Sequence, residues 1–475
     1  MHKTIHRLVV SILAAGACAA ADAQTSDPAL NVLVKKGIIT EQEAKQAIAD
    51  LEKEKASKTP PPVTTSPPSA SPTATSAEAV ERAKLWGPRD VRFFWKDGLN
   101  FESGDGKTFK GKIGGRMQYD IAGFGQDDDV RGLVGDADIS TEFRRARLYT
   151  SGEINEGAPI YYILQMDFAG GDVRFTDAYL GMRDIPYLGS VQLGQMYEPF
   201  SLEQLTSDNY VTLLERAAPI ETFSPARNLG IQVQNALFGD RMTYAFGVFA
   251  DDENDDADGD AFESNGRVTA RVTGLPWYDQ ESGGRRYLHV GVGGSAMDLR
   301  DEMVRYRTRP EAHLAPRYVD TGNVSAEWAY LGNLEALLTY ESFSLQAEYF
   351  QTCLESSGMS DPSFSGFYVM GTWFLTGEHR PYKKSAGVVD RVKPKKNFSL
   401  SGGGLGALEL IGRVSQVDLN DDAVRGGRLT DYTAGLGWYL NPNTRFFFNY
   451  IYADLNRSGV SGGTHIWQTR FQVDF

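Results

Sequence analysis

Arginine is the residue type in this chain whose spacing points most directly to chemistry. Arg305, Arg307 and Arg309 alternate along one segment, so an extended backbone would place three guanidinium groups on one face. A guanidinium is always charged and binds phosphate through a planar fork of N–H donors. Several such groups in series, with Arg317 nearby, would form successive weak sites that an anion can enter and leave. The alternative is an exposed basic loop that contacts lipopolysaccharide.

Other arginines alternate with apolar neighbours in segments that have the pattern of strands. If the apolar face contacts lipid, an arginine on that face would cost about 2 to 4 kcal/mol near the membrane midplane. The arginines are therefore expected to face inward. The set turned inward by this argument is Arg116, Arg145, Arg147, Arg267 and Arg271. Each of them could instead be neutralised by an inward carboxylate such as Asp167 or Asp177.

Residues 377–404 form a second basic segment. It contains Arg380, Lys383, Lys384, Arg391, Lys393, Lys395 and Lys396, and Asp390 is the only acid between 379 and 396. Lysine is a flexible and strongly hydrated cation, so such a cluster at a pore exit would attract anions without holding them. A solvated basic loop is the simpler alternative.

No arrangement of residues in the sequence favours catalysis. A nucleophile needs a base within hydrogen-bond reach, whereas His289, His313, His379 and His465 fall on separate segments without metal-ligand spacing. We therefore predict no enzyme, no cofactor and no metal site. Seven acids in residues 251–260 could bind Ca²⁺ through carboxylates. A solvated loop or a divalent bridge to lipopolysaccharide is the preferred interpretation of that segment.

The elements that must position these residues are strands with two opposite faces. In residues 464–475, Trp467, Phe471 and Phe475 share one face, and polar residues that include Arg470 and Asp474 share the other. This period of two, apolar outside and polar inside, is typical of a transmembrane barrel strand. Arg470 would then be a lumen cation, with Asp474 as a candidate partner that neutralises it.

Sixteen such segments recur along the chain, an even number as a closed antiparallel barrel requires. They begin near Lys112, Thr141, Ile160, Val173, Ser190, Leu229, Arg241, Arg267, Tyr287, Trp328, Phe343, Gly366, Leu405, Thr430, Arg445 and Thr464. We therefore predict an all-β fold, a 16-stranded antiparallel transmembrane β-barrel preceded by a short helical or coiled-coil segment and a Pro-rich linker.

The lengths of the connections support this prediction. Counted back from Phe475 on the periplasmic side, connections such as 155–159, 239–240, 341–342 and 441–443 are short, and 123–140, 198–228, 251–266 and 298–327 on the other side are long. Short periplasmic turns and long outer loops are the rule for such barrels. The basic segment 377–404 is the exception, because it is long and yet periplasmic.

The first 88 residues have a different character. Residues 1–23 combine basic residues, an apolar run and an Ala-Asp-Ala end, which predicts a secretory signal peptide. Residues 24–56 have helical spacing and could form a periplasmic coiled coil, or only a marginal helix. Residues 57–88 are a linker rich in Pro, Ser and Thr, and 89–475 form the outer-membrane barrel. The net charge of −14 argues against nucleic acid as a partner.

Several motifs resemble the porin O/P family of phosphate- and polyphosphate-selective porins. They are Phe143-Arg144-Arg145-Ala146-Arg147-Leu148, Thr176-Asp177-Ala178-Tyr179-Leu180-Gly181, Glu198-Pro199-Phe200-Ser201-Leu202-Glu203, Arg227-Asn228-Leu229-Gly230 and Phe374-Leu375-Thr376-Gly377-Glu378-His379-Arg380-Pro381-Tyr382. The resemblance implies a trimer of sixteen-stranded barrels, an inward-folded third outer loop, an arginine ladder and a periplasmic lysine cluster.

Carried onto this chain, the resemblance assigns Arg305, Arg307 and Arg309 to the ladder and Arg144, Arg145 and Arg216 to the constriction. It makes Asp177 an inward carboxylate and 198–228 the constricting loop. The phosphate-selective members have a lysine in that loop, whereas Arg216 and Arg227 are its only cations here. This difference is compatible with a preference for anions, but it removes the lysine that the resemblance would associate with specificity for phosphate.

The sequence as a whole predicts an outer-membrane porin that lets anions diffuse passively through an arginine-lined pore. Phosphate or polyphosphate is the expected solute, and outer-membrane lipid and lipopolysaccharide are the expected surroundings. One alternative is a porin for sugars, carboxylates or other solutes, with the lumen arginines neutralised by acids. Another is a structural barrel tethered through its N-terminal segment.

Overall fold

The computed structural model describes residues 90–475, except 252–264, 300–302, 357–359 and 422. The predicted signal peptide, helical segment and linker therefore lie outside the described residues, as does nearly all of the acidic segment 251–260. Within the described ranges, the chain has no helix of the length and apolar character that crossing a membrane requires.

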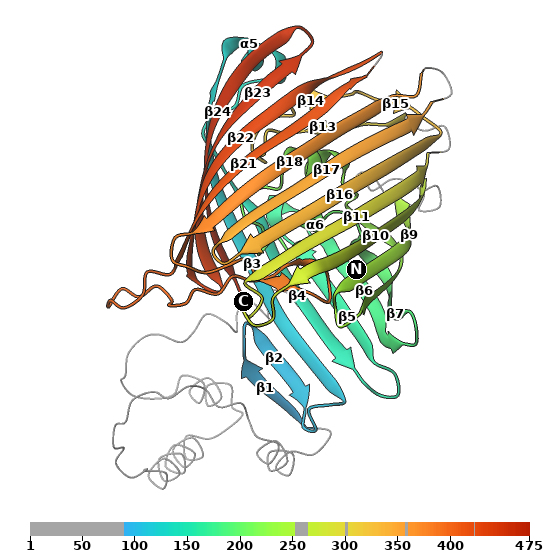
Figure 1. Ribbon diagram of the computed structural model, residues 1–475, viewed down its shortest axis with the longest axis vertical. Helices are drawn as coiled ribbons and strands as arrows, with labels where there is room; N and C mark the ends of the chain where they lie inside the picture. Colours follow the sequence, from blue (N-terminus) through green and yellow to red (C-terminus); the bar gives the residue numbers. More distant parts are fainter. Residues whose placement is uncertain (1–89, 252–264, 300–302, 357–359, 422) are drawn as a thin grey trace, which may run out of the picture. The chain divides into compact units, whose positions relative to one another are not determined.

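Sixteen antiparallel strands form a closed barrel (Figure 1). They are β3 (Phe109–Gln126), β4 (Ser140–Ile154), β5 (Ile160–Asp167), β6 (Arg174–Ile185), β7 (Gly189–Tyr197), β8 (Arg227–Leu237), β9 (Met242–Asp251), β10 (Asn265–Tyr278), β11 (Arg286–Asp298), β16 (Trp328–Tyr340), β17 (Phe343–Glu355), β18 (Ser363–Phe374), β21 (Ala407–Asp421), β22 (Val424–Asn441), β23 (Thr444–Arg457) and β24 (Val460–Asp474). Each pairs with the next barrel strand along the chain, and β24 closes the barrel on β3, where Arg470 lies opposite Asp120. The predicted fold class is confirmed.

Two shorter strands precede the barrel. The sequence pattern does not predict them, because it assigns residues 89–475 to the barrel as a whole and places the first strand near Lys112. The two strands are β1 (Val91–Trp95) and β2 (Leu99–Ser103), which pair with each other, and β2 also pairs with the first residues of β3. Most predicted strand starts lie close to the observed ones. The largest difference is at β22, where the predicted start at Thr430 falls inside a strand that begins at Val424.

Short elements occupy the connections between the barrel strands. The helical ones are α5 (Asp128–Val134), η1 (Ala169–Gly171), α6 (Leu202–Leu205) and α7 (Ala218–Phe223). The extended ones are β12 (Met303–Val304), β13 (Arg307–Thr308), β14 (Val319–Asp320), β15 (Val324–Ser325), β19 (Tyr382–Lys383) and β20 (Val388–Val389). We call the barrel end that carries Phe475 the C-terminal rim and the other end the opposite rim.

The strands present an apolar face outward and a more polar face inward. In β17, exposed and buried residues alternate almost throughout. Leu345 and Tyr349 are exposed on the outer face, whereas Gln346 and Glu348 are buried on the inner face. A side-chain period of two places alternate residues on opposite faces of a strand. The outer face therefore suits lipid, and the inner face can support a polar lumen.

One side of the lumen is filled by an apolar core. Phe200 and Phe223 from connection 198–226 pack against Phe350 on β17, with ring centroids 6.2 and 6.4 Å apart. Tyr306 from connection 299–327 packs against Phe223 at 5.7 Å and Phe364 at 5.8 Å. Inward apolar residues of β17, β18 and β21 to β24 complete this cluster. The two connections thus occupy the side of the barrel formed by these strands, and the open space is left beside β3 to β10.

Candidate functional site

Connection 198–226 folds into the barrel and is fixed to its wall. Glu348 on β17 accepts hydrogen bonds from the backbone N–H groups of Leu202 and Glu203, at 3.1 and 2.9 Å. Arg413 on β21 pairs with Glu203 at 3.3 Å and donates to the carbonyl of Glu215 at 3.0 Å. Carboxylates that accept several N–H bonds and buried arginine pairs hold a backbone in one geometry. The connection is therefore held in one geometry inside the barrel, and it is the segment to which the resemblance assigns the constriction.

The second long connection is anchored through the same arginine. Glu311 in connection 299–327 pairs with Arg413 at 2.5 Å and accepts hydrogen bonds from Ser415 and Thr433 at 2.6 and 2.7 Å. All of these side chains except that of Thr433 are almost completely inaccessible. One arginine of the barrel wall thus interlocks the two connections that narrow the lumen.

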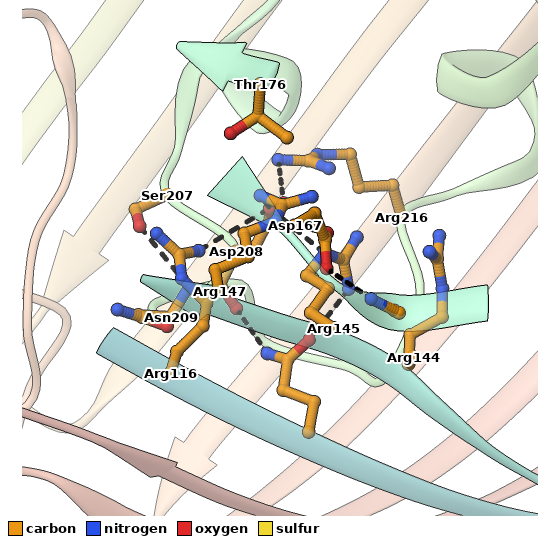
Figure 2. Close-up of polar contacts among 12 residues, drawn as sticks. Arg116, Arg144, Arg145, Arg147, Asp167, Thr176, Ser207, Asp208, Asn209 and Arg216 are labelled. Atoms are coloured by element: carbon orange, nitrogen blue, oxygen red, sulfur yellow. Dashed lines mark hydrogen bonds and ion pairs between the residues drawn. The ribbon is translucent and has the colours of Figure 1, made fainter. Parts of the chain in front are cut away.

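The centre of the constriction is a single carboxylate surrounded by four arginines (Figure 2). Asp208 lies 2.7 Å from Arg216, 2.9 Å from Arg147, 3.1 Å from Arg145 and 3.5 Å from Arg116. Burial alone would raise the pKa of Asp208, but the surrounding guanidinium groups hold that pKa well below its usual value. Asp208 therefore stays ionised, and the cluster keeps an excess of positive charge.

The arginines of this cluster are not equally neutralised. Arg147 also pairs with Asp167 at 2.6 Å, and Arg216 donates to three backbone carbonyls of its own connection. Arg116 has only the long 3.5 Å contact to Asp208, and its Nε has no hydrogen-bond partner within the described part of the chain. Arg116 is therefore the guanidinium of the cluster with the most unused hydrogen-bonding capacity.

A β-bulge in β4 turns one more arginine inward. Gln118 on β3 pairs with Arg145 and the next β3 residue pairs with Phe143, so Arg144 has no opposite residue. The extra residue of a bulge lets two consecutive side chains face the same side of a sheet. Arg144 accordingly reaches Glu215 in the lumen, with an N···O distance of 2.9 Å.

A cavity of about 780 Å³ lies between the Asp208 cluster and the opposite rim. Its charged lining comprises eight arginines, Arg144, Arg145, Arg147, Arg174, Arg216, Arg227, Arg309 and Arg317, and four acids, Glu142, Asp167, Glu215 and Glu221. Converging like charges in a concave space attract counter-ions. We call this space the entrance cavity; its lining carries more arginines than acids.

Two cavities lie on the other side of the constriction, towards the C-terminal rim. Their volumes are about 350 and 780 Å³, and both are lined by Lys383, Ser385 and Ala386 of the basic connection 375–406. The larger one is also lined by Lys110, Lys112 and Arg183, with Glu153 as its only acid. The positive character of the lumen thus continues beyond the constriction.

The basic connection reaches these cavities because part of it folds into the barrel. Arg271 on β10 donates to the carbonyl of Gly387 at 2.9 Å and pairs with Glu335 at 2.7 Å. Tyr382 on β19 hydrogen-bonds to the Nδ1 atom of His289 at 2.6 Å, and Nε2 of the same ring lies 3.2 Å from Glu335. Residues 382–389 are thus held against the inner wall.

The structure divides the predicted basic cluster into different environments. Arg380 is buried against Glu409 at 2.7 Å, and Arg391 pairs with Asp474. Lys384 donates to the carbonyl of Gly239, whereas Lys393, Lys395 and Lys396 are exposed. Of the lysines in this cluster, Lys383 alone lines the described cavities.

One prediction for the last strand is wrong. Arg470 does not pair with Asp474 but with Asp120 and Glu215, each at 2.6 Å, while Asp474 pairs with Arg391. Residues four apart on a strand face the same side but are separated along it by more than a hydrogen bond. Cross-strand and loop carboxylates are closer, and they neutralise Arg470.

The remaining arginines also have partners of their own. Arg227 stacks on Tyr197, with its guanidinium carbon 3.8 Å from the ring centroid, and forms a bidentate pair with Asp177. Arg267 lies 3.7 Å from Glu198. These contacts bear out the alternative that inward carboxylates neutralise part of the arginine set.

Arg305, Arg307 and Arg309 alternate with the buried Tyr306 and Thr308, but they lie in different environments. Arg305 pairs with Asp320 at 2.5 Å, and Arg307 is exposed. Arg309 and Arg317 share Glu221, at 3.2 and 2.7 Å, and line the entrance cavity. Neither Arg305 nor Arg307 lines any of the cavities described above.

Sequence reasoning missed most of the acids and one central arginine of this site. Asp208, Glu203, Glu215 and Glu311 lie on connections, where no periodicity indicates direction. Arg413 alternates with Gly412 and Val414 on β21, so its inward direction could have been inferred from parity. The bulge at Arg144 could also have been inferred from the sequence. Phe143 and Leu148 both face outward, although their positions are an odd number of residues apart, and a regular strand would place them on opposite faces.

The residues described here form no group of three or more His, Cys, Asp or Glu that could hold a metal ion. The four histidines of residues 90–475 make separate contacts: His289 with Tyr382, His313 with Glu142, His379 with Arg285 and His465 with Tyr450. The polar groups that converge in the lumen are instead arginines and carboxylates, which suit binding and passage of ions.

Comparisons with known proteins agree with this geometry. The sequence profile of the family "Phosphate-selective porin O and P" matches residues 112–475. An uncharacterised protein of Caulobacter vibrioides is 31% identical over 93% of this chain and 89% of its own length, and porin O of Pseudomonas aeruginosa is 27% identical over 82% and 93%. Among solved structures, an anion-selective porin from Comamonas acidovorans superposes with a TM-score of 0.50 at 13% identity, covering 77% of this chain and all of that one.

Proposed function

Because the chain belongs to the family of phosphate-selective porins O and P, and is thus an outer-membrane porin, we propose that it conducts anions passively through an arginine-lined pore. The observation that carries the proposal is the cluster of Arg116, Arg145, Arg147 and Arg216 around the single carboxylate of Asp208. The cluster is fixed in place before any solute arrives, so it stabilises an anion without reorganisation. A channel needs no cofactor, nucleophile or energy input for this role.

Phosphate or polyphosphate is the solute that the chemistry of the lumen favours. Guanidinium groups bind phosphate oxygens through paired N–H donors. The entrance cavity brings eight arginines and four acids together, so a multiply charged anion gains more there than chloride does. The absence of lysine from connection 198–226 leaves these arginines as the recognition groups.

A porin for sugars, carboxylates or other solutes is the second candidate. It is favoured by the pairing of nearly every lumen arginine discussed above with a carboxylate, such as Arg144 with Glu215 and Arg227 with Asp177. In such a pore, the paired charges would orient polar solutes rather than select anions. The two candidates differ in their expected selectivity for ions.

Reversal potential in a potassium chloride gradient across a planar bilayer distinguishes them. A reversal potential close to the equilibrium potential of chloride supports the anion pore. A reversal potential near zero, or close to the equilibrium potential of potassium, overturns it. Phosphate titrated into the chloride solution then tests the finer claim. Block of chloride current at submillimolar phosphate supports a phosphate site, and no block leaves a general anion pore.

We further propose that the C-terminal rim faces the periplasm and that three copies of the chain assemble in the outer membrane, surrounded by lipid and lipopolysaccharide. Every connection at the C-terminal rim except 375–406 is short, and the long connections 198–226 and 299–327 lie at the opposite rim, which supports this orientation. Membership of the porin family supports the homotrimer. Chemical crosslinking in intact membranes would show a ladder that ends at three chains, and a ladder that ends at one would overturn the assembly.

A further inference from the structure

The β1–β2 hairpin carries a continuous apolar face. Val91, Phe93 and Trp95 alternate along β1, and Phe101 and Leu99 on β2 lie opposite Phe93 and Trp95. The other face holds the ion pair between Arg92 and Glu102, with Asn100 opposite Phe94, the one aromatic residue of β1 on this side. Directly opposite residues in an antiparallel pair share one face of the sheet. The hairpin is therefore as amphipathic as the barrel strands, although nothing in the pore requires it to be.

This apolar face continues the outer face of the barrel. Leu99 lies opposite Ile113 on β3, which is exposed on the outer face, and the rings of Phe101 and Phe109 have centroids 5.4 Å apart. Trp95 stacks on the terminal Phe475, with ring centroids 6.3 Å apart and planes at 19°. In Figure 1 the hairpin lies beside the start of β3, at the end of the barrel that carries the C-terminus. The lipid-facing surface thus extends past the last barrel residue onto the hairpin.

The hairpin is seated tightly on this rim. Its turn contains Gly98 with φ at +131°, and a Cβ there would lie 2.9 Å from the carbonyl oxygen of Ile113 and 3.1 Å from the terminal carbon of Phe475. Only glycine tolerates that backbone conformation and that approach. The position of the hairpin relative to the barrel wall is therefore fixed rather than incidental.

Two features limit where this face can reside. Phe93 and Trp95 are 66% and 69% exposed, which is unfavourable in bulk water for side chains of this size. Among the described strands, β1 pairs with β2 alone, so the backbone groups on its other edge need water or headgroups. An unpaired edge is not tolerated in hydrocarbon. The membrane–water interface meets both requirements, and aromatic side chains concentrate there.

We propose that the β1–β2 hairpin docks with Phe93, Trp95, Leu99 and Phe101 at the boundary between headgroups and acyl chains of the phospholipid leaflet at the C-terminal rim. The polar face with Arg92 and Glu102 is turned away from the lipid. The hairpin thereby extends the membrane anchor of the barrel by two strands. This inference rests on placement in the outer membrane and not on anion conduction.

The test compares labels on the two faces of β1 in the full chain. Cys18 and Cys353 are replaced by serine, and a single cysteine is introduced by Phe93→Cys or, as the matched control, by Arg92→Cys. Each is labelled with an environment-sensitive fluorophore and reconstituted into vesicles of phosphatidylethanolamine and phosphatidylglycerol. Quenching is measured with a lipid that carries a nitroxide near the headgroup and, separately, with aqueous iodide.

The proposal predicts that the label at position 93 is quenched several-fold more by the nitroxide lipid than the label at position 92, and less by iodide. Equal quenching of both labels by iodide would overturn it. Protection of position 93 from both quenchers, with energy transfer between labels on different chains, would also overturn it by showing that a second copy covers this face. Conductance of both labelled variants shows that they have folded, whatever their ion selectivity.

Discussion

The carboxylate of Asp208 lies 2.7 Å from the guanidinium of Arg216 on the same lumenal connection. That carboxylate also contacts Arg147 on the barrel wall at 2.9 Å, so it links the connection to β4. Asp208 therefore has two effects. It positions the constriction, and it cancels part of the positive charge that would meet an anion there.

Replacing Asp208 by Asn is expected to raise the preference for anions. The neutral amide fills the same space but leaves the surrounding guanidinium groups without their shared counter-charge. If a permeating anion gains about 1 kcal/mol, as for charges about 4 Å apart in water, the anion-to-cation permeability ratio rises about fivefold. Reversal potentials in a chloride gradient measure the ratio. Asp240→Asn, in a turn at the C-terminal rim, is the control and should leave the permeability ratio unchanged. An unchanged ratio in Asp208→Asn as well would refute the proposal that Asp208 cancels positive charge in the path of the anion.

The pKa of Asp208 predicts how this selectivity depends on pH. A carboxyl group whose pKa is depressed in the folded state contributes stability above its unfolded pKa of about 3.9, and that stability is lost only as the pH falls through the lower folded value. Asp208 should therefore remain ionised at about pH 4, where an ordinary aspartate is half protonated. The native channel at that pH should still differ in permeability ratio from Asp208→Asn. If the permeability ratios of the native channel and of Asp208→Asn became equal as the pH falls from neutral to about 4, the lowered pKa of Asp208 would be contradicted.

Arg413→Met is expected to destabilise the barrel strongly. Methionine has a comparable length but leaves the buried carboxylates of Glu203 and Glu311 without their cation. Breaking a buried ion pair from one side typically costs about 3 to 5 kcal/mol. The free energy of unfolding in detergent micelles, followed by tryptophan fluorescence in guanidinium chloride, measures the loss.

Arg428→Met is the matched control for that experiment. Arg428 pairs with Asp418 at 2.6 Å, but its side chain is 55% exposed. Exposed pairs contribute about 0 to 1 kcal/mol, so this variant should unfold nearly like the native chain. Equal losses in the two variants would show that Arg413 does not hold the lumenal connections in place.

If the outer face contacts lipid, the cost of placing an arginine on it should depend on the depth of the residue in the membrane. Leu334 on β16 is 60% exposed on the apolar outer face, and Leu334→Arg should cost about 2 to 4 kcal/mol of unfolding free energy if it lies near the membrane midplane. Leu188, in a turn at the C-terminal rim, is 45% exposed. Leu188→Arg should cost about 0 to 1 kcal/mol because the rim lies at the interface. Unfolding from phospholipid vesicles measures both losses, and a loss near zero for Leu334→Arg would contradict the assignment of its face.

The sequence by itself determined the barrel. A side-chain period of two fixes which residues of a strand share a face, so the alternation in β24 and the number of such segments were enough to predict sixteen strands and a polar interior. The same parity predicted the inward direction of Arg145, Arg147 and Arg271. The hairpin of β1 and β2 was missed because its alternation continues that of β3 across two short turns.

Only the tertiary structure decided what the inward residues do. Connections have no periodicity, so the sequence could not show that Asp208 meets four arginines or that Glu311 meets Arg413. The pairing of Arg470 was predicted wrongly for the same reason, because its partners Asp120 and Glu215 come from a strand and a connection remote in sequence. Whether an arginine in the lumen is free to bind a solute depends on the distance to its nearest carboxylate, and that distance is set by how the chain folds across the barrel rather than by its order.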